Sequence, residues 1–537
     1  PGGSGGIPGY AEGGAIYVSA QDPDREYSFG DFDSFRRITI EDCTIINSTA
    51  IGGRGGDGGP RAGETRGAYG GGTYADPEQG DVRRYTSKGG GVSVDSFTNA
   101  TLKNCVIEGN TVIGSISGLG SDSWANYQWQ PRLNYQLPGL GGGLYCSSNS
   151  NVTVDGCEIV SNKSTFEAEN LSNELYFLGK QSAGYGGGIC VDGWYYYNGI
   201  SGINDEYYSF YDDEDEHSVD DLPVHENVIN FKMIDSHVEG NISPVGGGIY
   251  SAWMKDSQIT DCNIVENIAD VGGGMFATST LNSVMDRVLV SRNKANPRNV
   301  MLPETTSDDG TSSVNGITFR DGYGGGMYMN TSDMTIRNSE ISENSSAGVG
   351  GGGYFTGTEN SLVEDGETTY TPAVPELRNC LVLKNTALKA GGGIANNWHV
   401  QSVVENCTIV GNAVTAEDGF GGGIYSIHDS NSLVTNSILW ENKAANGPQI
   451  AVSSGSPTLP FPSNFELKYS DVQGYSDPNS ISVDETSTLN AESIIDADPL
   501  FVDGYHLSHL AALQADDSPA IDAGDPQATY LLNDPNG

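Results

Sequence analysis

The sequence predicts an all-β protein in which short repeats stack into a parallel β-solenoid. Three observations support this prediction: glycine clusters recur along the chain, a motif ending in asparagine lies between them, and apolar and polar residues alternate within each unit. A unit of about 26 residues cannot bury its apolar face alone, so its copies must stack on one another.

A glycine cluster followed by apolar residues marks the start of each unit. Clear copies are GGGLYC at Gly141, GGGIYS at Gly246, GGGMFA at Gly272 and GGGIYS at Gly421. Gly246 and Gly272 are 26 residues apart, which gives the period where no insertion interrupts the repeat. Because glycine adopts left-handed conformations and allows close backbone approach, we expect a sharp corner at each cluster. A flat glycine groove that admits a partner is the alternative.

The residues between two glycine clusters alternate with a period of two. In the motif ITDCNIVEN, Ile259 and Val265 fall on one parity, whereas Cys262 and Ile264 fall on the other. Short alternating runs between glycines predict strands and not helices. Each unit then forms one coil, about 4.8 Å from the next.

The asparagine that ends each unit is predicted to stack into a ladder. In a turn, its side-chain amide can satisfy backbone groups and the neighbouring asparagine. A ligand site is the alternative to this structural role. The ladder positions are Asn110, Asn162, Asn241, Asn267, Asn293, Asn344, Asn385, Asn412 and Asn442.

Five of the eight cysteines share one register, five residues before the terminal asparagine: Cys105, Cys157, Cys262, Cys380 and Cys407. Disulfides are one interpretation if the protein is extracellular. Stacked side chains about 4.8 Å apart hold their Cβ atoms farther apart than a disulfide prefers, so we expect buried and mostly reduced thiols. Zinc is disfavoured because the sequence contains no CxxC pair.

The charge balance excludes several classes of partner. The chain has 70 Asp and Glu against 26 Lys and Arg, which gives a formal net charge of −44. Nucleic-acid phosphates and anionic membrane surfaces would be repelled, so neither is an expected partner. No apolar run reaches the length of about 18 residues that a membrane-spanning segment needs.

The repeats resemble the right-handed parallel β-helix repeats of bacterial surface proteins, nearest to polymorphic outer-membrane protein repeats with their GGA[ILV] and FxxN motifs. Here Ile, Val or Leu stands where those repeats have Phe. YSDVQG at Tyr469, DADPLFVDGYHLS at Asp496 and SPAIDAGDP at Ser518 resemble the end of choice-of-anchor β-helix proteins. The resemblance implies a right-handed parallel β-helix, roughly ten to twelve coils long, in an extracellular or bacterial cell-surface location.

The domain prediction divides the chain at residue 454. Residues 1–454 are expected to form the β-helix, and residues 455–537 a capping region close to an anchor. Insertions at one corner become neighbours when coils stack, so partners are expected to bind to these lateral loops. The predicted insertions are 49–88, 111–140, 163–185, 191–229, 296–323 and 355–374.

Two insertions are rich in aromatic residues: Trp124, Tyr127 and Trp129 in one, and Trp194, Tyr195, Tyr196 and Tyr197 in the other. Exposed aromatic rings stack on sugars and are favoured at protein interfaces. A small hydrophobic cluster under the loops is the third interpretation.

An acidic run follows the second aromatic insertion: Asp212, Asp213, Glu214, Asp215 and Glu216. Ca²⁺ takes six to eight oxygen ligands, which this segment could supply in part. The run lacks the residue order of an EF-hand, so a solvated acidic surface is the alternative to a calcium site.

The expected function is that of a structural or adhesive surface protein and not of an enzyme. Its expected partners are further copies of itself, in a head-to-tail filament or surface layer, or other surface proteins and glycans. The alternative is a β-helix protein that binds or cleaves polysaccharide. Glycoside hydrolysis needs two carboxylates at a fixed separation, and no His-Gly dipeptide of the pectinase type occurs. Only His399 and His428, near Trp398 and Asp429, are expected to face a common groove.

Overall fold

The computed structural model describes most of the predicted repeat in two compact units. Unit 1 comprises Pro1–Ser257, Ile264–Phe276 and Asn296–Asp321, and unit 2 comprises Gln258–Asn263, Ala277–Ala295 and Gly322–Gly537. The residues whose structure is described are 13–18, 36–51, 87–95, 98–114, 139–147, 150–165, 184–192, 229–296, 311–314, 317–320, 322–364, 367–455 and 461–526.

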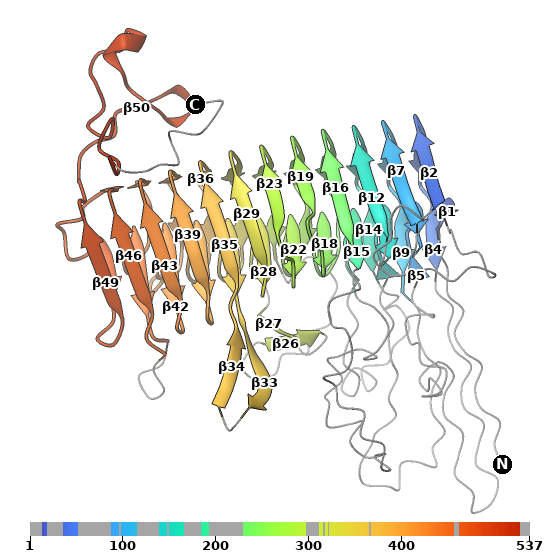
Figure 1. The fold of residues 1–537 in the computed structure, drawn as a ribbon, viewed down its shortest axis with the longest axis horizontal. Coiled ribbons are helices and arrows are strands. Elements are labelled where there is room, and N and C mark those ends of the chain that lie inside the picture. Colours follow the sequence, from blue (N-terminus) through green and yellow to red (C-terminus); the bar gives the residue numbers. More distant parts are fainter. Residues whose placement is uncertain are drawn as a thin grey trace, which may run out of the picture. The chain divides into compact units, whose positions relative to one another are not determined.

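The described residues are almost entirely β-structure, as the sequence predicts. Their helical segments are two short 3-10 helices, η7 (Asp503–Tyr505) and η8 (Leu510–Ala512). The strands of successive coils lie side by side within each unit (Figure 1). None of these helices is long and apolar enough to cross a membrane.

In unit 1 the chain passes in turn through four parallel sheets. The first contains β1 (Ile16–Val18), β6 (Val92–Val94), β11 (Leu144–Ser147), β15 (Ile189–Asp192) and β18 (Ile249–Ala252). The second contains β2 (Arg36–Glu41), β7 (Thr98–Lys103), β12 (Asn151–Asp155) and β16 (Asn230–Ile234). The third contains β3 (Thr44–Ile46), β8 (Val106–Glu108), β13 (Glu158–Val160) and β17 (His237–Glu239). The fourth contains β4 (Thr49–Ile51), β9 (Thr111–Ile113) and β14 (Lys163–Thr165).

Unit 2 repeats the same course. Its first sheet contains β28 (Met327–Asn330), β32 (Gly353–Thr356), β38 (Ile394–Asn397), β42 (Ile424–Ile427), β45 (Ile450–Ser453) and β48 (Ile481–Val483). Its second contains β19 (Gln258–Thr260), β23 (Ser283–Asp286), β29 (Asp333–Arg337), β35 (Val374–Arg378), β39 (Gln401–Glu405), β43 (Asn431–Thr435), β46 (Asn464–Lys468) and β49 (Thr488–Glu492).

The third sheet of unit 2 contains β24 (Leu289–Ser291), β30 (Glu340–Ser342), β36 (Leu381–Leu383), β40 (Thr408–Val410), β44 (Ile438–Trp440) and β47 (Asp471–Val472). The fourth contains β25 (Lys294–Ala295), β31 (Ser345–Ser346), β37 (Thr386–Ala387) and β41 (Ala413–Val414). Five further strands are β5 (Ser87–Lys88), β10 (Gly139–Leu140), β20 (Asn263–Val265), β21 (Ile268–Ala269) and β22 (Met275–Thr278). The other six form antiparallel pairs: β26 (Thr311–Val314) with β27 (Ile317–Arg320), β33 (Thr358–Glu364) with β34 (Glu367–Thr371), and β50 (Phe501–Val502) with β51 (His506–Leu507).

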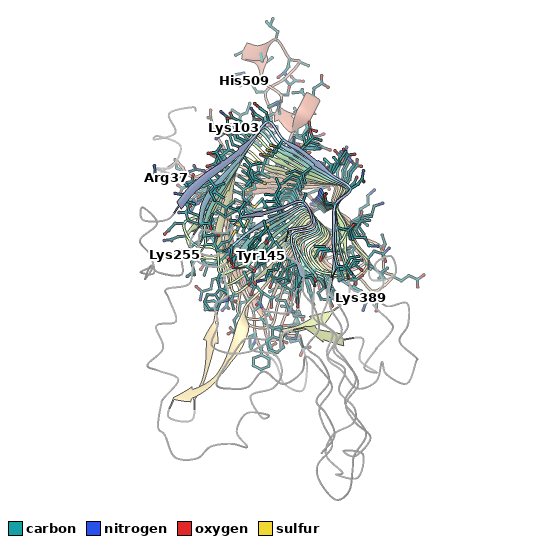
Figure 2. The ribbon with its side chains drawn as sticks, turned by 90° about the vertical axis from the view of Figure 1, so that its right-hand side faces the viewer. Arg37, Lys103, Tyr145, Lys255, Lys389 and His509 are labelled. Atoms are coloured by element: carbon teal, nitrogen blue, oxygen red, sulfur yellow. The ribbon has the colours of Figure 1, made fainter. Side chains whose placement is uncertain are left out.

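The interior of the coils is built from aliphatic and aromatic ladders. Val152 pairs with Phe231 and Val154 with Met233 across β12 and β16, and all four side chains are buried. Figure 2 looks along the direction of repetition and shows the strands of successive coils overlaid. Burial of each large apolar side chain stabilises the fold by about 2 kcal/mol before conformational entropy is subtracted.

The asparagine ladder is confirmed within each unit. Asn385 is fully buried, and Asn344 donates to its Oδ1 from both the backbone N and Nδ2, at 3.0 and 2.9 Å. Asn385 in turn donates from its backbone N and Nδ2 to Asn412 Oδ1 and from Nδ2 to the Ile341 carbonyl. The same pattern joins Asn241 to Asn267 in unit 1 and Asn293 to Asn344 in unit 2.

The cysteine register is also confirmed, and all eight cysteines are free thiols. The backbone N of Cys105 donates to Cys157 Sγ at 3.4 Å, and that of Cys407 donates to Ser437 Oγ at 3.1 Å. Burial raises the pKa of Cys157 to about 11, so this thiol stays protonated at neutral pH. This position therefore holds small buried side chains: serine accepts the same backbone N–H in other coils, and Val288 fills the position without accepting one.

Each glycine of a cluster has its own reason to lack a side chain. Gly391 is left-handed, with φ of 61°. A Cβ on Gly392 would lie 2.5 Å from the carbonyl oxygen of Gly422 in the next coil, which is too close for any real contact. The glycine clusters therefore form sharp corners with close backbone approach, as predicted.

Four predicted boundaries are wrong by a few residues or more. The parallel sheets continue past residue 454, because β46 pairs with β43 and β49 pairs with β46. The predicted insertions 49–88, 111–140 and 163–185 each begin with a strand of the fourth sheet, which pairs with its neighbours in parallel. A capping role for the residues after β49 stays a prediction.

Candidate functional site

The outer face of the first sheet in unit 2 carries a row of aromatic side chains. Tyr328, Tyr354 and Tyr425 take the second position of β28, β32 and β42. Side chains alternate along a strand, and the neighbouring residues Met329 and Phe355 are buried in the coil interior. The tyrosines therefore point away from that interior.

Further rings join this row. The ring centroid of Tyr354 lies 4.9 Å from those of both Tyr323 and Tyr328, and Phe420 stacks on Tyr425 at 5.9 Å. Ala395 of β38 takes the equivalent position between Tyr354 and Tyr425, so Tyr425 and Phe420 form a separate pair, in which Phe420 is 39% exposed. Burial raises the pKa of Tyr425, so its phenol stays neutral and can donate a hydrogen bond.

The turn that follows this sheet holds an unusual backbone. Trp398 and His399 are both left-handed, with φ of 54° and 56°, and His428 and Asp429 repeat this one coil later, with φ of 55° and 56°. These are the only two consecutive pairs of non-glycine residues with positive φ in the described part of the chain. Such a conformation costs about 1 kcal/mol or more per residue, and strained residues of this kind cluster at functional sites.

Three backbone hydrogen bonds hold the two turns in place. Gly357 donates to the Trp398 carbonyl at 2.7 Å, and His399 donates to the His428 carbonyl at 3.1 Å. Asp429 donates to the Phe461 carbonyl at 2.9 Å. The strain is therefore offset by bonds that also link successive coils.

Aromatic contacts fix the position of Trp398. His428 stacks on it with ring centroids 4.3 Å apart and an interplanar angle of 12°, and Phe461 meets it edge-on at 5.2 Å. Trp398, His428 and Phe461 are each half-buried, so part of this surface is open to solvent.

A hydrogen-bond chain connects this turn to the aromatic row. Asn397 Nδ2 donates to the Tyr354 hydroxyl at 2.6 Å, and Asn397 Oδ1 lies 2.7 Å from His428 Nδ1. Because an amide oxygen can only accept, His428 Nδ1 carries a proton and donates it to Asn397. The orientation of His428 is thus set by its partner.

His399 and Asp429 form the second polar pair. His399 Nδ1 lies 2.9 Å from Asp429 Oδ2; His399 is buried, whereas the Asp429 side chain is 48% exposed. We call the group Tyr354, Asn397, Trp398, His399, His428, Asp429 and Phe461 the corner site. It combines flat ring faces with amide, imidazole and carboxylate groups, which is the combination that binds sugar rings and hydroxyls.

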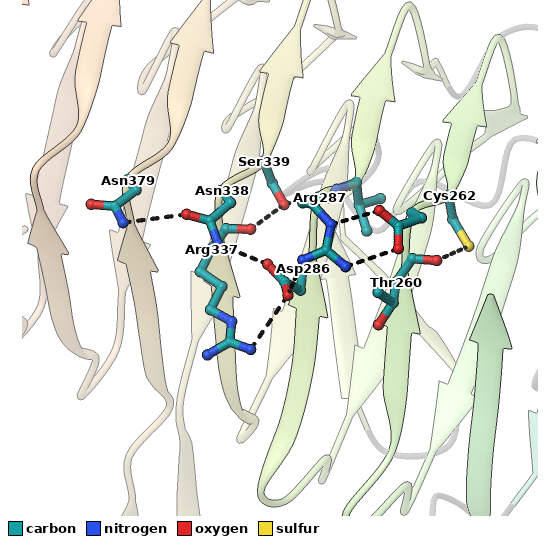
Figure 3. A network of polar contacts seen from close by, with 10 residues as sticks. Thr260, Cys262, Asp286, Arg287, Arg337, Asn338, Ser339 and Asn379 are labelled. Atoms are coloured by element: carbon teal, nitrogen blue, oxygen red, sulfur yellow. Dashed lines mark hydrogen bonds and ion pairs between the residues drawn. The ribbon is translucent and has the colours of Figure 1, made fainter. Parts of the chain in front are cut away.

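A second polar network lies at the turn between the second and third sheets of unit 2 (Figure 3). Arg287 donates to Asp261 from Nε and from a terminal nitrogen, at 2.6 and 2.8 Å, and Asn338 and Arg337 donate to Asp286. The hydrogen bond from Arg287 lowers the pKa of Asp261. Arg287, Arg337 and Asp261 are about half exposed, whereas Asp286 is largely buried beneath them. Each charge is paired with another, and ion pairs with such exposed partners contribute little energy, so the network is structural.

The structure brings together one predicted pair and leaves other predicted sites open. His399 and His428 lie in adjacent turns with Trp398 and Asp429, as expected. Sequence reasoning missed Tyr354, Asn397 and Phe461, although the tyrosine that recurs after several of the glycine clusters was a signal for the aromatic row. Outside the described residues lie Trp124, Tyr127, Trp129, Trp194, Tyr195, Tyr196, Tyr197 and the acidic run Asp212, Asp213, Glu214, Asp215 and Glu216.

Among the residues that the structure describes, no group of three or more His, Cys, Asp or Glu side chains is arranged to hold a metal ion. A calcium site in the acidic run stays a prediction.

Comparisons with known proteins support the fold. Residues 305–465 match the family model described as a right-handed β-helix region. Among curated proteins, none matches the chain.

Solved structures similar to this chain include the periplasmic alginate epimerase AlgG, with a TM-score of 0.36, 10% identity, and coverage of 77% of this chain and 76% of that one. Another is tailspike protein gp49 of Acinetobacter baumannii bacteriophage Fri1, a capsular polysaccharide depolymerase, with a TM-score of 0.24, 10% identity, and coverage of 75% of this chain and 56% of that one. Together with the parallel pairing, the family match confirms that the chain has a right-handed parallel β-helix.

Proposed function

We propose that this protein is an extracellular or cell-surface β-helix protein that binds glycans at the corner site. The observation that carries the proposal is the half-buried Trp398, held between His428 and Phe461 beside the exposed carboxylate of Asp429. An aromatic ring fixed in this way presents its surface without losing side-chain entropy on binding. Adhesion to a glycan surface is the role that follows.

The strained turns add to this argument. Trp398 and His399 occupy left-handed positions that glycine or asparagine would fill at lower cost. Besides packing against His428 and Phe461, a tryptophan at this position offers its indole ring to a ligand.

The test is binding of a soluble polysaccharide panel, measured by affinity electrophoresis, for wild-type protein and Trp398→Ala. We expect Trp398→Ala to weaken binding by about tenfold or more, since loss of one aromatic anchor costs about 2 kcal/mol. The matched control is Trp440→Ala, which removes a tryptophan from the third sheet and should leave affinity unchanged. Equal affinity of wild-type and Trp398→Ala protein would reject the corner site.

A second candidate, polysaccharide cleavage, is favoured by the His399–Asp429 pair, because a carboxylate that orients an imidazole is a common acid–base arrangement. Incubation of the bound glycan with the protein tests it. New reducing ends that disappear in His399→Gln would support catalysis, and an unchanged polymer would leave binding as the function.

A further inference from the structure

We infer that the glycan taken by the corner site carries amino groups and not uronic acids. This inference rests on the proposed function and concerns the substrate class of the same site.

The strands and turns that build the site contain neither lysine nor arginine. Residues 353–357, 394–400, 424–430, 450–455 and 461–463 hold only the imidazoles of His399 and His428 as basic groups, and His399 is already paired with Asp429. Acidic polysaccharides need basic side chains to neutralise their carboxylates, because a buried or half-buried anion without a partner is costly. A uronic acid would therefore find no lysine or arginine from these segments.

The same segments present one carboxylate. Asp429 is half exposed, and one of its oxygens is already 2.9 Å from His399 Nδ1. The carboxylate accepts hydrogen bonds only, and an ammonium group is the sugar substituent that donates most strongly to it. Asp429 thus gives the site a preference for sugars with an ammonium group, which aromatic stacking alone would not give.

Trp398 extends this preference. A cation over an indole face is stabilised by about 0.5–2 kcal/mol, and tryptophan is the best of the aromatic residues in this role. The part of Trp398 that His428 leaves uncovered can therefore favour a protonated amino sugar over its neutral counterpart.

The charge of the chain acts in the same direction. A formal net charge of −44 attracts a cationic polymer and repels an anionic one at long range. Local and long-range charges agree, and both oppose uronic acids.

The test uses three β-1,4-linked hexasaccharides with the same backbone: glucosamine, glucose and glucuronic acid. Binding is measured by isothermal titration calorimetry at a pH where the amino groups are protonated and at physiological ionic strength. We expect the glucosamine hexamer to bind about tenfold more tightly than the glucose hexamer, and the glucuronic acid hexamer to bind most weakly.

Two variants with the same change in net charge separate the site from non-specific attraction. Asp429→Asn should remove most of the preference for glucosamine, whereas Asp503→Asn, at an exposed residue of η7, should retain it. Thermal unfolding of both variants checks that they fold. If the two variants lost the preference for glucosamine equally, only the overall charge would attract the ligand, and the inference would be overturned.

The remaining outcomes distinguish this inference from the proposed function. If all three hexamers bind equally and Trp398→Ala abolishes binding, the proposed function stands and the inference fails. If the glucuronic acid hexamer binds as tightly as the glucosamine hexamer, the inference also fails. If Trp398→Ala changes no affinity, both fail.

Discussion

At the scale of single residues, Asp471 shows how burial sets the behaviour of one carboxyl group. Its side chain is 3% exposed, and Oδ1 accepts a hydrogen bond from the Ala497 backbone N at 3.2 Å. Within the described part of the chain, Oδ2 has no hydrogen-bond partner. Burial, with the nearby carboxylates of Asp496 and Asp498, raises the pKa of Asp471 to about 6.

This raised pKa predicts a stability change with pH. Between the ordinary carboxyl pKa and about 6, the folded protein holds a proton that the unfolded chain releases, so the contribution of Asp471 to stability falls as pH rises through this range. Asp471→Asn should therefore stabilise the protein at pH 7, by about 1–3 kcal/mol, and change little at pH 4.

Chemical denaturation of wild-type protein and Asp471→Asn at several pH values provides the measurement. The difference between the two free energies of unfolding isolates this carboxyl group from the others. A difference that is constant across the pH range would contradict the assignment.

The corner site shows the limit of sequence reasoning at this scale. His399 and His428 could be paired from the period of the repeat, because the turns that hold them are about one coil apart. The bond between Asn397 and Tyr354 could not be predicted, since it depends on which side of the strand each residue faces and on two rotamers. Phe461 follows an interruption of the repeat, so its position carried no signal.

At the scale of elements, the asparagine ladder links successive coils in addition to the sheets. Asn385 is fully buried, and Asn385→Ala would remove four of its hydrogen bonds. Oδ1 accepts two of them from Asn344, and Nδ2 donates the other two, to the Ile341 carbonyl and to Asn412 Oδ1. Buried groups left without partners cost about 1–3 kcal/mol each. We expect a loss of about 3 kcal/mol or more in the free energy of unfolding.

Asn490→Ala is the matched control, because Asn490 lies exposed on β49. Urea denaturation of both variants tests the prediction. A ladder variant as stable as the control would mean that the asparagines contribute little.

Periodic elements were predictable and boundaries were not. The ladders repeat in every coil, so a single sequence contains many copies of the same signal. The end of the repeat was missed because Gly447, Pro448 and Gln449 stand where other coils have a glycine cluster. The backbone keeps its course without the motif, since Gly447 is left-handed like the first glycine of other clusters and Gln449 accepts a hydrogen bond from Asn442.

At the scale of the whole molecule, the net charge of −44 dominates. Self-repulsion of this size destabilises the folded state, and added salt screens it. Raising the NaCl concentration from low to physiological values should raise the thermal unfolding temperature by about 2–5 °C. An unfolding temperature that fell with salt would contradict this prediction.

Divalent cations extend the same experiment. If the acidic run from Asp212 to Glu216 binds Ca²⁺, CaCl₂ at matched ionic strength should raise the unfolding temperature more than MgCl₂ does. Equal effects of the two salts would indicate a solvated acidic surface.

The central claim is that Trp398 binds a sugar ring at the corner site. A crystal structure with bound glucosamine hexamer tests this claim most directly. We predict a sugar ring against the indole of Trp398, with an amino group within hydrogen-bond distance of Asp429. A hexamer bound elsewhere, for example at Trp124 or Trp194, with Trp398 unoccupied would contradict the account.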